Sequence, residues 1–160
     1  MYRIGQSNDI HQLVVGRDLI LGGVNIPFEK GLLGHSDADC LIHSIAEAII
    51  GALGMKDLGT HFPDTDPQFK GISSLVILRH VCKMMDDKGY MINNIDSLIM
   101  IEKPKMAPYL ALMKENIACA LNCDEDLVNI KATRGEKLGF IGRNEGVMCS
   151  TSLLLRRKDI

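Results

Sequence analysis

Stretches with a helical period alternate along this chain with stretches of β-forming residues, and this alternation limits the fold more than any other feature. Apolar residues recur at helical spacing after Ser36, over residues 74–88 and over residues 109–121, and glycine ends the first two of these stretches. The predicted strands and hairpin are residues 2–4, 19–28, 91–101, 128–132 and 147–156. We therefore expect an α+β fold, a mixed β-sheet with helices packed on one side.

Length, charge and hydropathy exclude several classes of protein. A chain of 160 residues is near the usual size of one domain, so residues 1–160 are expected to form a single domain. The net charge of -2, with basic residues scattered, makes nucleic acid an unexpected partner. No apolar run reaches the roughly 18 residues of a membrane span, and the first residues lack the pattern of a secretion signal. We expect a cytoplasmic, bacterial protein, although a processed plastid chain would look the same.

The best candidate ligands for a metal are Asp9, His11 and His43. Asp9 and His11 are two residues apart, so in an extended chain both side chains point to the same face. A carboxylate and two imidazoles suit Zn²⁺ and leave its fourth position open for a substrate. Spacing alone also allows a turn aspartate beside a surface histidine.

Two other segments carry polar groups in patterns found at ligand sites. His35 and Ser36 precede the first predicted helix, whose N-terminus would attract anions, but Ser36 could also act only as its N-cap. The Gly- and Pro-rich loop at residues 59–71 is expected to be functional because of its length. Its aspartates, with Asp57, could bind hydroxyl groups or could simply form turns.

Five segments together resemble one enzyme family, over nearly the whole chain and in order. They are RIGQSNDIHQL, GGVNIPFEKGLLGHSDAD, DLGTHFPDTDPQFKG, EKPKMAP and KATRGEKLGFIGRNEG. The family resembled is that of the 2-C-methyl-D-erythritol 2,4-cyclodiphosphate synthases, which serve the non-mevalonate isoprenoid pathway. The resemblance implies a homotrimer around a central axis, with active sites at subunit interfaces. It also implies that a cytidine-diphosphate derivative of methylerythritol 2-phosphate is cyclised with release of CMP.

By this resemblance, Asp9, His11 and His43 hold zinc, and Glu136 holds a second divalent ion, Mg²⁺ or Mn²⁺. His35 and Arg134 are the residues expected to act on the phosphates. The full set of expected substrate contacts is Asp9, His11, His35, Ser36, Asp57, Leu58, Gly59, Phe62, Pro63, Asp64, Thr65, Asp66, Lys103, Pro104, Lys105, Met106, Ala107, Thr133, Arg134, Gly135, Glu136, Phe140 and Arg143. The neighbouring subunit would supply those from Lys103 onward. Phe140 and Arg143 resemble residues of the trimer's central cavity, where a prenyl diphosphate can bind.

The chain departs from the family pattern at two places. Ser7 and Asn8 stand where a glycine and an aromatic residue are usual, and Arg134 and Gly135 stand where threonines are usual. Arg134 could replace a hydroxyl donor by a charged one, or it could overfill the site. A trimer of the same fold that binds metal or isoprenoid diphosphate without cyclising is therefore the main alternative. An unrelated zinc hydrolase is a third, and it would leave Glu136 without a role.

Overall fold

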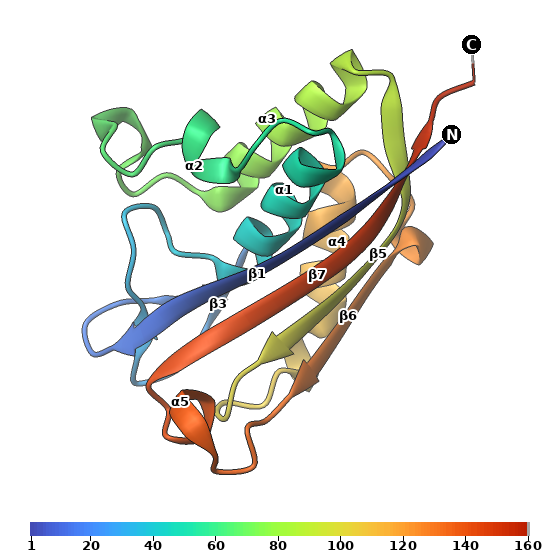
Figure 1. The fold of residues 1–160 in the computed structure, drawn as a ribbon. Coiled ribbons are helices and arrows are strands. Elements are labelled where there is room, and N and C mark those ends of the chain that lie inside the picture. Colours follow the sequence, from blue (N-terminus) through green and yellow to red (C-terminus); the bar gives the residue numbers. More distant parts are fainter. Residues whose placement is uncertain (160) are drawn as a thin grey trace.

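A five-stranded mixed sheet forms the body of the protein in the computed structural model, which describes residues 1–159 (Figure 1). Its order is β4 (Gly31–Leu32), β1 (Tyr2–Val14), β7 (Gly146–Arg157), β5 (Tyr90–Met100) and β6 (Val128–Thr133). β5 and β6 run parallel, whereas the other neighbouring strands are antiparallel.

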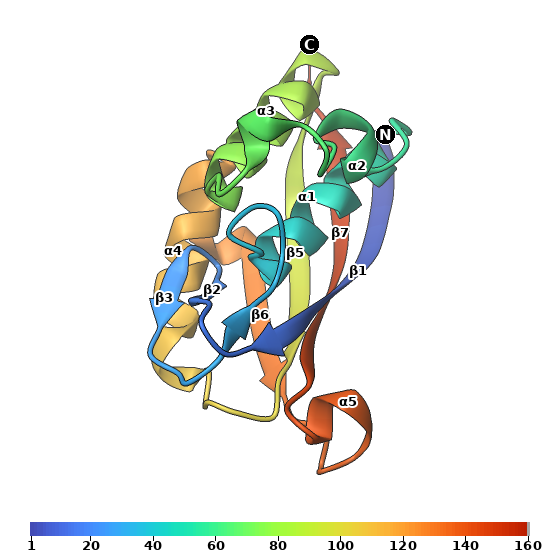
Figure 2. The same cartoon turned by 90° about the vertical axis from the view of Figure 1, so that its left-hand side faces the viewer.

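Three long helices cover one face of this sheet, as Figures 1 and 2 show from two sides. They are α1 (Cys40–Ala52), α3 (Ser74–Asp87) and α4 (Leu110–Ala120), and a small hairpin of β2 (Leu19–Leu21) and β3 (Val24–Ile26) lies beside them. The expected α+β class, with helices on one side of a mixed sheet, is confirmed. Short helices α2 (Leu58–His61) and α5 (Gly139–Gly142) and the 3₁₀ turns η1 (Pro67–Phe69), η2 (Ala107–Tyr109) and η3 (Glu125–Leu127) complete the fold. Among residues 1–159, none of the helices combines the length and the apolar character that a membrane span requires.

Helix α1 is the centre of the core, packed against β1 and β7 on one side and α3 on the other. Its apolar side chains are fully buried, as expected of a helix that is hydrophobic nearly all round. It lies very close to β1 at Gly5, where a Cβ atom would be 2.0 Å from the Ala48 carbonyl oxygen. This glycine thus fixes how near α1 can come to the strand that carries Asp9 and His11.

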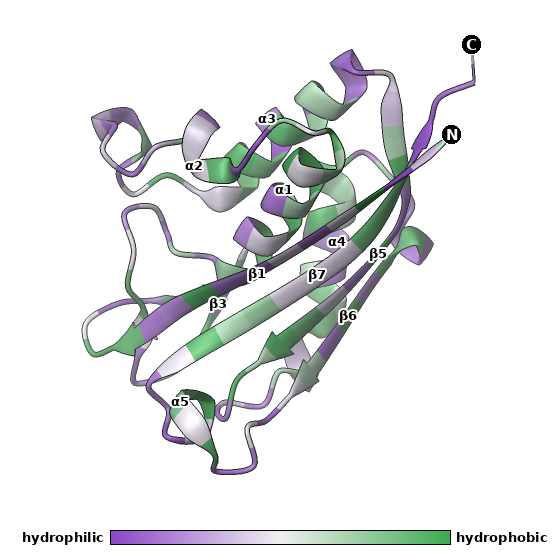
Figure 3. Cartoon of the chain, in the orientation of Figure 1, coloured by the Kyte–Doolittle hydropathy of each residue, from purple (hydrophilic) through white to green (hydrophobic). Residues whose placement is uncertain are grey.

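Strand β1 is much longer than the predicted residues 2–4. Its residues alternate between the helix-covered face, with Ser7, Asp9 and His11, and the open face, which exposes Ile4 and Ile10. Figure 3 shows polar and apolar segments mixed along this open side of the sheet. The long strand confirms the extended backbone from which the convergence of Asp9 and His11 was predicted.

Two other local predictions need correction. Helix α1 begins at Cys40, not directly after Ser36, because the buried carboxylate of Asp39 caps it by accepting from the Ile42 amide at 3.0 Å. Asp39 also accepts from the amides of Gly22 and Gly23, which ties the helix start to the β2–β3 turn. The predicted loop at residues 59–71 contains most of α2 and all of η1.

Candidate metal centre and active site

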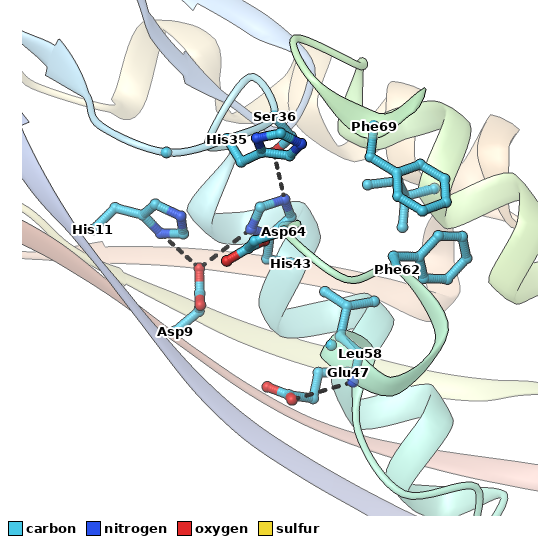
Figure 4. A pocket seen from close by; sticks show the side chains of 13 residues that line it. Asp9, His11, His35, Ser36, His43, Glu47, Leu58, Phe62, Asp64 and Phe69 are labelled. Atoms are coloured by element: carbon cyan, nitrogen blue, oxygen red, sulfur yellow. Dashed lines mark hydrogen bonds and ion pairs between the residues drawn. The ribbon is translucent and has the colours of Figure 1, made fainter. Parts of the chain in front are cut away.

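Asp9, His11 and His43 converge where β1 meets α1 (Figure 4). Asp9 Oδ2 lies 2.8 Å from His11 Nδ1 and 3.6 Å from His43 Nδ1, and one ligand atom from each residue lies within 4.8 Å of the others. All three side chains are half-buried. Adjacent elements therefore place a carboxylate and two imidazoles around one point.

The unsatisfied atoms of this cluster fit a metal. Among residues 1–159, Asp9 Oδ2 and His11 Nδ1 are buried side-chain atoms without a hydrogen-bond partner, although they lie close together. Buried polar atoms are rarely left in this state, since each costs about 1–3 kcal/mol. A divalent cation bound by these atoms would satisfy both, and the oxygen and nitrogen donors suit one.

The charges of the three side chains depend strongly on one another. Burial alone would raise the pKa of Asp9, but its close contacts with the imidazoles of His11 and His43 outweigh burial and lower this pKa. Burial alone would lower the pKa of each histidine, but Asp9 raises both. The protein without metal therefore favours a carboxylate between protonated imidazoles, and a cation would have to displace those protons.

A cavity of about 230 Å³ opens next to the three ligands. His35 and Ser36 line it, as predicted, from the segment before α1. His35 Nε2 donates a hydrogen bond to the Asp66 carbonyl oxygen at 3.0 Å, which joins this segment to the loop after α2. Ser36 is buried, and its hydroxyl lies 3.2 Å from His43 Nε2.

The segment from Asp57 to Asp66 borders the cavity only in part. Leu58, Gly59, Phe62 and Asp64 line it. Asp57 instead caps α2, where it accepts from the Thr60 hydroxyl at 2.7 Å and from the Thr60 amide at 2.9 Å. These two bonds lower the pKa of Asp57. Asp66 caps η1 through the Gln68 amide, so both of these aspartates also form turns. Pro63 and Thr65 lie between the lining residues.

Glu47 also lines the cavity, although it is not among the site residues that the sequence predicts. Its carboxylate accepts from Ser7 Oγ at 2.9 Å and from the Leu58 amide at 3.4 Å, so it joins β1 to the start of α2. It follows His43 by four residues in the same helix, and this spacing alone would have placed the two side chains on one face. Ser7, one of the departures from the family pattern, therefore has Glu47 as its hydrogen-bond partner.

A second cavity, of about 420 Å³, is lined by residues at and just after the ends of β5 and β6. Both strands end towards the bottom of Figure 1. Of the described residues, none lines both cavities. The predicted residues that line the second cavity are Pro104, Lys105, Met106, Ala107, Thr133, Arg134 and Glu136. The structure thus groups most of the predicted contacts into two sets that line separate cavities of one subunit.

The remaining predicted residues lie near the second set. Glu102 accepts from the Gly135 amide at 2.8 Å and from the Lys137 amide at 3.2 Å, which holds the turn that carries Glu136. Lys103 is exposed beside it. Phe140 lies in α5, and Arg143 follows that helix and pairs with Glu145, their nearest side-chain atoms being 2.7 Å apart.

Comparison with known proteins gives one consistent result. The 2-C-methyl-D-erythritol 2,4-cyclodiphosphate synthase of Bacillus pumilus (strain SAFR-032) is 56% identical over 158 residues, covering 99% of this chain and 100% of the relative. The Bacillus subtilis (strain 168) enzyme of the same name is 54% identical, over 98% and 99% of the two chains. The solved structure of Plasmodium falciparum IspF in complex with CDP superposes with a TM-score of 0.87 at 37% identity, over 99% of this chain and 97% of that one. Since the YgbB family also matches residues 2–156, this chain belongs to the YgbB family.

Proposed function

We propose that the protein is a 2-C-methyl-D-erythritol 2,4-cyclodiphosphate synthase. It would convert 4-diphosphocytidyl-2-C-methyl-D-erythritol 2-phosphate to the 2,4-cyclodiphosphate with release of CMP. An oxygen of the 2-phosphate bonds to the β-phosphorus, and the bond from that phosphorus to the oxygen of the leaving CMP breaks. The observation that carries the proposal is the Asp9, His11 and His43 cluster beside a cavity, in a chain 56% identical to a synthase over its full length.

Charge and position are what the protein must supply in this reaction. The attacking phosphate is already anionic near neutral pH, so no side chain has to be deprotonated to create a nucleophile. Zn²⁺ held by Asp9, His11 and His43 would act as a Lewis acid on a phosphate oxygen. His35 and Ser36 would orient the phosphates from the wall of the same cavity. Binding both phosphates on one scaffold removes much of the entropic cost of ring closure.

The methylerythritol part would lie along α2 and the loop after it. Leu58, Gly59 and Phe62 give the cavity an apolar wall there, and Asp64 gives it a carboxylate for hydroxyl groups. Asp57, Pro63, Thr65 and Asp66 would hold this segment in shape or complete the contacts. Glu47 would fix the start of α2 through its bond to the Leu58 amide.

The cytidine and its phosphates would bind to the second cavity of a neighbouring subunit in a homotrimer. Lys103, Lys105 and Arg134 bring positive charge there, and Glu136 would hold the second divalent ion, Mg²⁺ or Mn²⁺. Pro104, Met106, Ala107, Thr133 and Gly135 would shape the nucleoside site. Exposed Ile4 and Ile10 on the open face of the sheet support burial of that face between subunits. The CDP complex of the Plasmodium falciparum relative supports a nucleotide ligand.

Two further roles follow from the same proposal. Phe140 and Arg143, just before the start of β7, would face the trimer's central cavity and could receive a prenyl diphosphate there. The bacterial relatives support action in a bacterial cytoplasm, with residues 1–160 as one domain.

The experiment is turnover of the proposed substrate by purified protein with Zn²⁺ and Mg²⁺. CMP and the cyclic diphosphate should appear in equal amounts with wild type and should be absent with Asp9→Ala. Asp126→Ala, which changes an exposed aspartate that lines neither cavity, should behave like wild type. Binding of zinc and CDP without product would refute the synthase and favour the non-cyclising trimer.

A further inference from the structure

His43 has hydrogen-bond partners on the side of its ring that faces away from Asp9. Its Nδ1 points towards Asp9 Oδ2, whereas its Nε2 lies 2.9 Å from Ser74 Oγ and 3.2 Å from Ser36 Oγ. Ser74 is fully buried at the first residue of α3, where α3 packs against α1. The second ring nitrogen is therefore held by an element distant in sequence from both β1 and α1.

Asp37 sets the direction of these hydrogen bonds. Its carboxylate accepts from the Ser74 hydroxyl through Oδ1 and from the Ser74 amide at 3.0 Å through Oδ2. Oδ1 also accepts from the Asp39 amide at 3.1 Å. An ionised carboxylate can only accept, so the single hydroxyl hydrogen of Ser74 points to Asp37.

The direction of the Ser74 hydroxyl hydrogen determines which ring nitrogen of His43 carries a hydrogen. With its hydrogen given to Asp37, Ser74 Oγ can only accept from the imidazole, so Nε2 of a neutral His43 must be the protonated nitrogen. Nδ1 is then left with its lone pair, and it is the nitrogen that faces Asp9 and His11. This is the tautomer that a metal at the cluster requires.

We propose that Asp37 and Ser74 are positioning residues for the metal centre: they fix the tautomer and ring orientation of His43 so that its Nδ1 lone pair faces the metal. The inference rests on the proposed metal site but concerns residues that touch neither metal nor substrate. Ser36, whose hydroxyl already accepts from the Ala38 amide, offers a longer second contact to the same nitrogen. It would support the ring without replacing the link to Asp37.

Substitution of Ser74 tests the proposal with little disturbance of the fold. Ser74→Ala removes the hydroxyl but keeps the backbone amide that binds Asp37. The affinity for Co²⁺, followed by its visible absorption, should fall about tenfold or more. Ser73→Ala is the matched control, because within residues 1–159 the Ser73 side chain makes no capping bond; its Co²⁺ affinity should stay within about twofold of wild type. Thermal unfolding without metal shows whether either variant is folded.

A double substitution separates this role from a purely structural one. Asp37→Ala frees the Ser74 hydrogen to point at His43 Nε2, which favours the wrong tautomer, so it should weaken Co²⁺ binding when Ser74 is present. In the Ser74→Ala background it should have little further effect. Losses that multiply instead would overturn the relay.

Direct observation of the ring completes the test without any variant. In the zinc-loaded protein, ¹⁵N NMR of histidine should show His43 protonated at Nε2 and bound to metal through Nδ1; the reverse assignment would overturn the inference. Failure of wild type to bind Co²⁺ at all would refute the metal site itself, and the inference with it. Binding equal in wild type and Ser74→Ala would refute only the role of Ser74 and Asp37.

Discussion

Gly5→Ala tests whether the spacing between β1 and α1 sets the metal centre. The new Cβ would lie 2.0 Å from the Ala48 carbonyl oxygen, and Cβ atoms hardly ever come within 3.0 Å of another heavy atom, so the helix and strand must separate by about 1 Å. The obstacle is backbone, which cannot rotate away. Overpacking of this kind destabilises by about 1–3 kcal/mol, measurable by urea unfolding.

The same displacement should be felt at the metal, because β1 carries Asp9 and His11 whereas α1 carries His43. Metal–ligand distances tolerate only about 0.2 Å, and a misplacement of about 1 Å can reduce turnover roughly 100-fold. Gly51→Ala is the control in the same helix. Apart from its chain neighbours and the nearby helix backbone, no described atom lies within 4 Å of the added Cβ, so it should stabilise by about 0.5–1 kcal/mol and leave zinc affinity unchanged. Gly5→Ala with wild-type stability and zinc affinity would refute this reasoning.

Three other predictions concern the core, a buried carboxyl group and the metal. Thr151→Val should lower the free energy of unfolding by about 1–3 kcal/mol, because the buried Ser97 hydroxyl loses the Thr151 hydroxyl 2.8 Å away as its partner. Adding Ser97→Ala removes the unpaired hydroxyl and should recover much of this loss in urea titrations. No recovery would contradict the prediction. Burial raises the pKa of Asp39 to about 6 despite its amide donors, so the folded state holds this proton more tightly than the unfolded chain, and stability should fall as pH rises from 4 through 6. Asp39→Asn should lack this loss, so its stability relative to wild type should increase by about 2 kcal/mol between pH 4 and 7, and parallel pH curves would contradict it. Chelation of metal should abolish turnover and added Zn²⁺ should restore it, whereas full activity in a chelated, metal-free sample would exclude a metal-dependent synthase.

The elements that follow a simple period could be predicted from the sequence. α3 was predicted within one residue, and the turn between β2 and β3 falls within the predicted hairpin. β1 was predicted much too short because its outward residues Gln6 and Asn8 are polar and Ser7 is buried, which hides the usual signature of a strand. The predicted start of the first helix is too early because Ser36, Asp37 and Asp39 are all residue types that can cap a helix. The amides of Gly22 and Gly23, in the β2–β3 turn, bind Asp39 and so determine which of the three is the cap.

The candidate site could be predicted only where its residues share an element or match a family motif. Asp9 and His11 follow from the period of one strand, but their meeting with His43 depends on the pairing of β1 with α1. Ser74 and His43 lie in different helices and are 31 residues apart in the chain, so no local sequence pattern indicates their contact. The division of the predicted contacts between two cavities likewise depends on where β5 and β6 end, which a motif does not reveal.

We propose that one active site joins the metal cluster of one subunit to the second cavity of its neighbour. Anomalous X-ray scattering at the zinc edge, from crystals grown with Zn²⁺ and CDP, tests it most directly. We expect a peak bonded to Asp9, His11 and His43, with CDP spanning from that peak to the partner subunit's side of an interface. Zinc bound away from these three residues, or CDP bound entirely within one subunit, would contradict it.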